Sequence, residues 1–128
     1  MAVYARTRIQ REIDLLRRAD PSPYYSIYPH PDNIHVWSAN IHGLPALHQQ
    51  GKNYDLEITL PNNYPFIPPT VKVLCAIDHM HVDRKTNTIC SDILGPAWTP
   101  AYNIEAIVLA ICSLLTDNEP TRRSPRLN

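Results

Sequence analysis

The side chain in this sequence best suited to covalent chemistry is the thiol of Cys90, which follows the histidines His79 and His81. A thioester carrier needs an accessible thiolate that attacks another thioester, and its product must survive in water until an amine arrives. The neighbours of Cys90 include no adjacent base: they are Thr88, Ile89, Ser91 and Asp92. This setting favours a carrier over a protease-type Cys-His pair. The alternative is a buried structural cysteine, which is the more common fate of a lone cysteine.

Two other interpretations start from the same residues. Cys75, His79, His81 and Cys90 could all bind zinc, but the 3, 1 and 8 residues between them match no paired zinc-ligand spacing. A Cys-His hydrolase needs a third orienting group and an oxyanion hole, and the sequence nominates neither. We therefore predict no metal site. Cys75 and Cys112 lie in an apolar strand pattern and an apolar helix pattern, and we expect both in the core.

The length of the sequence predicts a single domain over residues 1–128, and its 44% of hydrophobic residues is enough to build a core. Twelve basic and twelve acidic residues cancel, so bulk charge favours neither a nucleic-acid nor a membrane partner. No stretch approaches the roughly 20 apolar residues of a membrane span, and residues 1–11 do not resemble a secretory signal. Three cysteines without short spacing then indicate free thiols in a reducing compartment, the cytoplasm or the nucleus.

Periodic apolar residues predict two helices and four strands. One helix spans residues 2–18, where apolar residues recur at helical spacing from Ala5 to Leu16. A second helix begins after Asn103, which we expect to cap it. Between the helices lie four strand-like segments, 24–28, 34–41, 54–60 and 71–74. Strands segregated from helices in this way indicate an α+β fold, with helices packed on a four-stranded antiparallel meander sheet.

Prolines mark the connections between these segments. The first strand is closed by a turn over residues 29–32, which contains Pro29 and Pro31. Residues 61–69 contain four prolines and cannot form a regular helix or an interior strand, because proline supplies no backbone donor. We expect a rigid connector there. The segment around Cys90, between the last strand and the second helix, is expected to be irregular.

The motifs around Cys90 occur in an order that closely resembles a known family. Residues 79–81 read HMH, 89–94 read ICSDIL, 98–101 read WTPA and 111–115 read ICSLL. The ubiquitin-conjugating enzymes read HPN, ICLDIL, WSPA and ICSLL in the same order. Residues 64–69, YPFIPP, resemble that family's connector between its third and fourth strands, and residues 8–12, RIQRE, resemble its first helix. Several matched blocks at similar intervals make the resemblance specific.

The resemblance implies an activity and a set of site residues. Cys90 would carry ubiquitin or a ubiquitin-like protein as a thioester, while ATP is consumed by the upstream activating enzyme, so no cofactor is expected. Phe66, Pro100 and Ala101 would form the docking patch for RING-type ligases. Arg8 and Arg11 would contact the activating enzyme, Arg8 also the ligase, although solvated helix arginines are equally common. The expected partners are ubiquitin, activating enzyme, ligase and a protein substrate. The rival hypothesis is a catalytically silent member that binds ubiquitin or a partner.

The sequence departs from the family near the thiol. His81 stands where the family has an asparagine. That asparagine is thought to stabilise the oxyanion formed when an amine attacks the thioester, or to shape the site. Histidine can donate one N–H in the same way, or His81 can be a solvated loop residue. Met80 replaces the family's proline. The turn from His81 to Cys90 is one residue longer than usual, and Asn87 suits a left-handed turn there. Asp83 could attract an incoming ammonium, or it could be a solvated turn residue.

The C-terminal end is the second departure. After Asp117 the family usually continues into two further helices, but this sequence stops at Asn128, which implies a divergent compact form, a truncated piece or a partner that covers the exposed face. Arg122 falls where an acidic residue often orients the acceptor lysine. Because a basic residue should repel lysine, lysine need not be the preferred acceptor.

Overall fold

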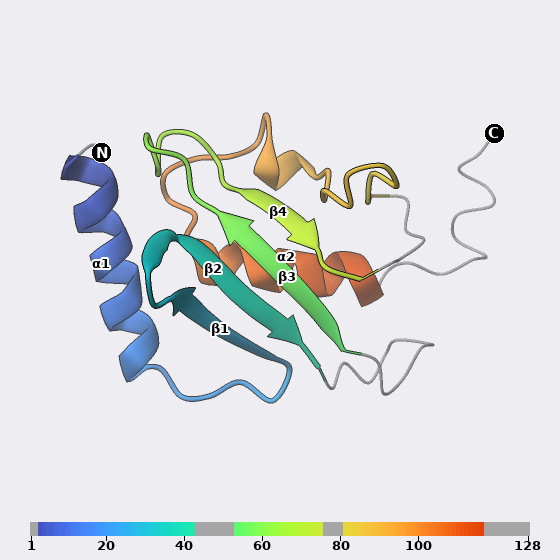
Figure 1. The fold of residues 1–128 in the computed structure, drawn as a ribbon, viewed down its shortest axis with the longest axis horizontal. Helices are drawn as coiled ribbons and strands as arrows, with labels where there is room; N and C mark the ends of the chain where they lie inside the picture. The colour runs from blue at the N-terminus through green and yellow to red at the C-terminus, as the bar shows by residue number, and fades with distance from the viewer. Residues whose placement is uncertain (1–2, 43–52, 76–80, 117–128) are drawn as a thin grey trace.

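The computed structural model describes residues 3–42, 53–75 and 81–116, and it has the predicted α+β architecture (Figure 1). Four strands form one antiparallel sheet in the order β1-β2-β3-β4, which confirms the predicted meander. The elements, in chain order, are α1 (Val3–Arg18), β1 (Tyr25–His30), β2 (Asn33–Ile41), β3 (Tyr54–Thr59), β4 (Thr70–Val73), the 3-10 helix η1 (Asp92–Leu94) and α2 (Ile104–Thr116).

The core lies between one face of the sheet and α2, which crosses behind the strands in Figure 1. Alternation within β2 and β3 places the large apolar side chains on that face, and the register pairs Trp37 with Ile58 and Ala39 with Leu56. The apolar side of α2 meets them and is buried at Ile104, Ile107, Val108, Ile111 and Leu115. Helix α1 closes one end with its buried apolar residues, Ala5, Ile9 and Ile13.

Several strand ends differ from the prediction by one or two residues. β1 continues through His30, with a register shift between Pro29 and His30, so the turn before β2 is tighter than the expected 29–32. A proline is accommodated at such an irregularity because no ladder donor is needed there. Leu74 was expected to belong to the fourth strand, but β4 ends at Val73 and Leu74 is 58% exposed. The two-residue period of the strand turns Leu74 to the outer face.

The two cysteines expected in the core differ in burial. Cys112 is 8% exposed on the inner side of α2. Cys75, which follows the end of β4, is half-buried and packs against the core, so it lies at the edge of the expected core rather than inside it. Within the described ranges, no helix is long and apolar enough to cross a membrane.

Helix α2 begins where the sequence predicted. The side-chain oxygen of Asn103 accepts a hydrogen bond from the Ala106 amide at 2.8 Å, which satisfies one of the unpaired donors of the first turn. The Ile104 amide, another of these donors, is satisfied by the Glu12 carboxylate of α1 at 2.8 Å. The start of α2 therefore depends on one local cap and on one contact from the other end of the sequence.

Asn103→Ala should lower the free energy of unfolding by about 0.5–2 kcal/mol, the usual cost of losing an N-cap side chain. Asn103→Asp is the matched control, because its carboxylate still accepts from Ala106 and should preserve stability. Urea unfolding followed by circular dichroism measures both. An alanine variant as stable as the wild type would show that the cap contributes nothing here.

Candidate active site

The segment before Cys90 folds as a short antiparallel turn. Val82 pairs with Ile89, and the Asp83 amide donates to the Thr88 carbonyl at 2.9 Å. The Asn87 amide closes the turn on the Asp83 carbonyl at 2.6 Å. Asn87 has a φ of 58°, in the left-handed region that asparagine tolerates better than most residues, as its position in the sequence predicted.

This turn is attached to the free edge of β4. The Val73 amide donates to the Asn87 carbonyl at 2.9 Å, and the Ile89 amide donates to the Val71 carbonyl at 2.8 Å. The side chains of Val82 and Ile89 are buried, so apolar packing adds to these hydrogen bonds. The backbone leading to Cys90 is thus held on the rigid sheet, although the segment is irregular, as expected.

The thiol of Cys90 is exposed, and among the three cysteines only this one is. Its amide donates to the His81 carbonyl at 2.7 Å, and its sulfur lies 3.9 Å from the Thr88 carbonyl oxygen, the length of a weak sulfur hydrogen bond. The interpretation of Cys90 as a buried structural cysteine is therefore wrong. η1 follows at once, and its first turn begins at the Ser91 carbonyl, which accepts from Leu94 at 3.0 Å.

His81 lies opposite Cys90 in the same ladder. The pair Val82–Ile89 and the hydrogen bond from the Cys90 amide to the His81 carbonyl set the register, so His81 and Cys90 are the next opposed residues. Opposed Cβ atoms in such pairs are about 5 Å apart. His81 is half-buried. The turn therefore brings together two residues that the sequence separates by nine positions.

Asp83 holds the turn. Its side-chain oxygen accepts the Lys85 amide at 2.8 Å, a local turn contact, and the residue is exposed. This geometry matches the alternative of a solvated turn aspartate, while a contact with an incoming ammonium stays a prediction. Of the four zinc ligands considered, His79 lies outside the described residues; within those that the structure describes, no group of three histidine, cysteine or acidic side chains could hold a metal ion.

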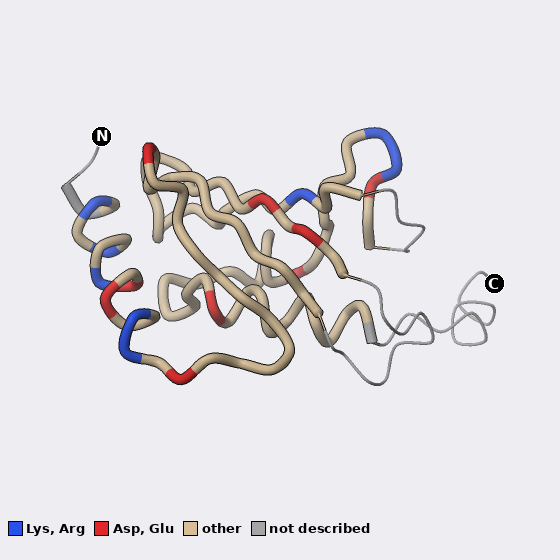
Figure 2. Tube along the Cα trace, turned by 60° about the horizontal axis from the view of Figure 1, so that its bottom comes forward, with Lys and Arg blue, Asp and Glu red and all other residues tan. Residues whose placement is uncertain are grey.

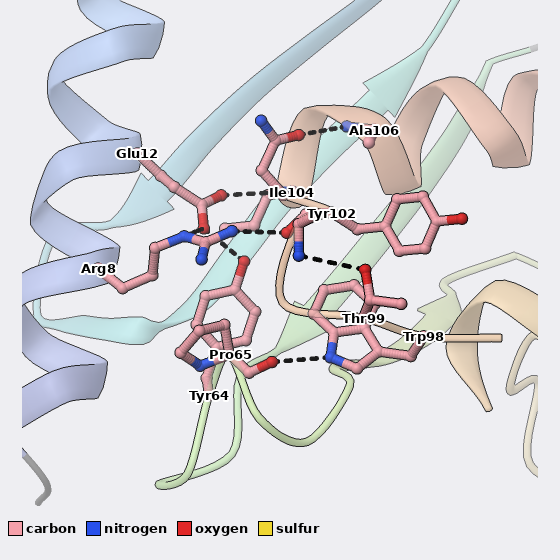
Figure 3. Close-up of polar contacts among 11 residues, drawn as sticks. Arg8, Glu12, Tyr64, Pro65, Trp98, Thr99, Tyr102, Ile104 and Ala106 are labelled. Atoms are coloured by element: carbon pink, nitrogen blue, oxygen red, sulfur yellow. Dashed lines mark hydrogen bonds and ion pairs between the residues drawn. The ribbon is translucent and has the colours of Figure 1, made fainter. Parts of the chain in front are cut away.

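The three predicted docking residues are exposed on two loops that meet. Phe66 is 59% exposed, and Pro100 and Ala101 are also exposed. The Trp98 indole N–H donates to the Pro65 carbonyl at 2.8 Å and ties one loop to the other, as Figure 3 shows. The centroid of the Trp98 ring also lies 6.0 Å from that of the Tyr64 ring and 5.7 Å from that of the Tyr102 ring. Trp98 is therefore a packing anchor for the two loops.

The two predicted arginines of α1 differ in setting. Arg11 is exposed on α1, a helix along which Figure 2 shows several basic residues. The Arg8 side chain is only 20% exposed; its guanidinium pairs with Glu12 at 3.0 Å and donates to the Tyr102 carbonyl at 2.6 Å. Arg8 is thus engaged inside the protein, and contacts of either arginine with a partner stay predictions.

Glu12 is a buried charged residue that the sequence analysis missed. It is 4% exposed, and its carboxylate accepts from Arg8, from the Tyr64 hydroxyl at 2.5 Å and from the Ile104 amide. Burial first, and the adjacent carboxylate second, raise the pKa of Tyr64 well above its ordinary value, so its hydroxyl remains a donor. A signal was present: Glu12 follows Ile9 by three residues and therefore falls on the apolar side of the helix.

Comparison with known proteins agrees with this geometry. A family model described as ubiquitin-conjugating enzyme matches residues 8–126, nearly the whole chain. The chain belongs to the ubiquitin-conjugating enzyme family. Membership confirms the resemblance read from the motifs around Cys90.

Solved structures of this family have the same fold. The chain is similar to a ubiquitin conjugating enzyme E2 from Plasmodium falciparum, with 32% identity and a TM-score of 0.78, over 88% of this chain and 99% of that chain. It is also similar to human ubiquitin-conjugating enzyme E2 G1, with 28% identity and a TM-score of 0.78, over 87% of this chain and 93% of that chain. The predicted departures at Met80 and Arg122 lie outside the described residues, as does the whole segment 117–128.

The thiols of this family member should differ in reactivity. Burial raises the pKa of the Cys112 thiol to about 11. A raised pKa leaves less thiolate, so at pH 8 Cys112 should react roughly 10²-fold more slowly than a thiol of ordinary pKa, before steric protection is counted. We expect iodoacetamide to modify Cys90 first, Cys75 next and Cys112 last, as measured by peptide mass spectrometry over time. All three should react alike in urea; equal rates for Cys112 and Cys90 in the native protein would contradict the assignment.

Proposed function

We propose that this protein accepts ubiquitin or a ubiquitin-like protein as a thioester on Cys90 and transfers it to an amine with the help of a ligase. The observation that carries the proposal is the position of Cys90: it is the exposed thiol, at the end of a turn that is hydrogen-bonded to the sheet. An exposed thiol can meet the thioester of a large protein, whereas Cys112 cannot.

Two substitutions at carbonyl carbon make up the chemistry. The Cys90 thiolate attacks the thioester carbon on the activating enzyme, and the tetrahedral intermediate expels that enzyme's cysteine as a thiolate. The modifier is then bonded to the Cys90 sulfur. The lone pair of an acceptor amine attacks the same carbon, the nitrogen passes a proton to solvent water, and the Cys90 thiolate leaves as the amide forms. ATP enters only through the activating enzyme, so this scheme assigns no metal or cofactor to the chain.

The surroundings of Cys90 suit a carrier. The residues that contact its backbone and sulfur are His81 and Thr88, through their carbonyl oxygens. Neither carbonyl can remove a proton from water, so these two contacts supply no general base for hydrolysis. His81, which lies opposite, is the nearest candidate in this turn to donate an N–H to the oxyanion of the second step.

Partner contacts complete the proposal. Phe66, Pro100 and Ala101, called here the docking patch, would receive a RING-type ligase, and the patch is an exposed apolar surface on loops tied together by Trp98. Arg11, exposed on α1, would contact the activating enzyme. Ubiquitin, these two enzymes and a substrate protein are the partners, in the cytoplasm or the nucleus.

The first test is charging of Cys90. Incubation with activating enzyme, ATP and ubiquitin should give an adduct that is lost on reduction, seen on a non-reducing gel. Cys90→Ala should abolish it, and Cys90→Ser should give an adduct that resists reduction, because an oxyester is a poorer acyl donor. Cys112→Ala is the matched control and should charge normally. Absence of any adduct on the wild type would favour the silent, binding-only alternative.

The second test concerns His81. If its N–H stabilises the oxyanion, His81→Ala should charge at the wild-type rate but discharge more slowly, by up to the 10²–10³-fold typical of one lost donor, roughly estimated. His81→Asn should restore the donor. Single-turnover discharge to free lysine and to a lysine-free peptide with an open amino terminus measures both acceptors. An α-amine has an ordinary pKa near ~8 against ~10.4 for lysine, so it needs less help to deprotonate. Unchanged rates in His81→Ala with both acceptors would refute the role.

A further inference from the structure

The buried carboxylate of Glu12 has no part in the thioester chemistry, yet it joins three segments of the chain. Figure 3 shows it on α1, facing Tyr64 of the connector and the first residue of α2. One oxygen accepts from Arg8 at 3.0 Å and from the Tyr64 hydroxyl at 2.5 Å, and the other accepts from the Ile104 amide at 2.8 Å. Such a charge is tolerated in the interior because its oxygens are paired.

Both loops of the docking patch are adjacent to these contacts. Tyr64 precedes Phe66 by two residues, and Ile104 follows Ala101 by three. Arg8 adds a bond from α1 to the Tyr102 carbonyl at 2.6 Å and lies 5.7 Å from the centre of the Tyr64 ring. The exposed patch is thus attached on its inner side to α1 through one carboxylate and its arginine.

Each of the two loops has local hydrogen bonds of its own. The Phe66 amide donates a hydrogen bond to the Asn63 carbonyl at 2.7 Å, and the Tyr102 amide donates one to the Thr99 carbonyl at 3.0 Å. These are contacts within a single turn, which keep each turn closed but do not set its position relative to the other loop. The link from Trp98 to Pro65 joins the loops to each other. The contacts through Glu12 and Arg8 join both to α1.

We propose that Glu12 is a positioning residue, which sets the relative placement of Phe66 and the Pro100-Ala101 loop by binding Tyr64 and Ile104 with one carboxylate. Preorganisation of a small apolar patch strengthens docking, because the partner need not order it on binding. This inference rests on the proposed function only in its consequence for the ligase; the ordering of the loops is a property of the free protein. Phe66, the exposed aromatic of the patch, would then depend for its placement on a residue that no ligase touches.

Amide hydrogen exchange of the free, full-length protein tests the ordering directly. Glu12→Gln keeps the size of the side chain but removes the charge that Arg8 and Tyr64 bind. Exchange at the Phe66 and Tyr102 amides should rise by about 10- to 100-fold, the range expected for losing a hydrogen bond to a charged group. The Leu60 and Val73 amides serve as references. They donate hydrogen bonds to the His35 and Asn87 carbonyls, and their exchange rates should rise less.

Two further variants guard against a general loss of stability. Asp14→Asn removes an exposed carboxylate from the same helix and should leave all these rates unchanged. Tyr64→Phe removes only the hydroxyl donor and should raise exchange at Phe66, and combining it with Glu12→Gln should add little, because both act through one contact. Equal acceleration at the loop and reference amides, or no acceleration at Phe66 in either variant, would overturn the proposal.

A second readout connects the ordering to the ligase. A RING domain that accelerates discharge of the wild-type thioester is tested on Glu12→Gln, with Phe66→Ala as the reference for a lost patch. The stimulation should fall towards the Phe66→Ala value, while charging and unstimulated discharge stay at the wild-type level. Full stimulation of Glu12→Gln would overturn the positioning role. If Cys90 accepts no modifier, the proposed function fails, and the exchange experiment still decides whether Glu12 orders the loops.

Discussion

The hydrogen bonds of the buried Glu12 carboxylate are the contacts on which the placement of α1, the 61–69 connector and the start of α2 depends. An ionised group in the interior is costly unless partners from the protein replace water, and here the partners come from α1, from the 61–69 connector and from α2. Those segments are far apart in the sequence, so the pairing of one charge brings them together. The side of the molecule that carries Phe66 is therefore organised by a polar contact as well as by apolar packing.

A second feature of the structure is the exposed thiol of Cys90. Cys90 is exposed, and its position is defined because the preceding turn is hydrogen-bonded to β4 and the side chains of Val82 and Ile89 are buried. Cys112 shows the contrast: the same side chain on the inner side of α2 is shielded, and burial raises its pKa to about 11. Environment, rather than residue type, separates a candidate nucleophile from a core residue.

Two of the departures from the family pattern, His81 and the turn that Asn87 closes, lie in the described segment that leads to Cys90. His81 lies opposite the thiol, in a turn closed by Asn87 in a left-handed conformation. Neither residue disturbs the ladder, since the bonds from Cys90 to His81 and from Asp83 to Thr88 are backbone contacts. A change of side chain at this position therefore leaves these backbone contacts of Cys90 in place.

The sequence by itself determined the elements and their order, because apolar period and proline placement are local: both helices, the four strands, the Asn103 cap and the left-handed Asn87 could all be predicted. It also nominated Cys90 through the motifs around it. Only the tertiary structure decided that Leu74 points outward, that Cys75 is half-buried and that Arg8 turns inward to Glu12 and Tyr102. Those outcomes depend on which distant segments lie side by side in the fold. The hydrogen-bond donors to the buried Glu12 carboxylate come from such segments, so they contact it only in the folded protein.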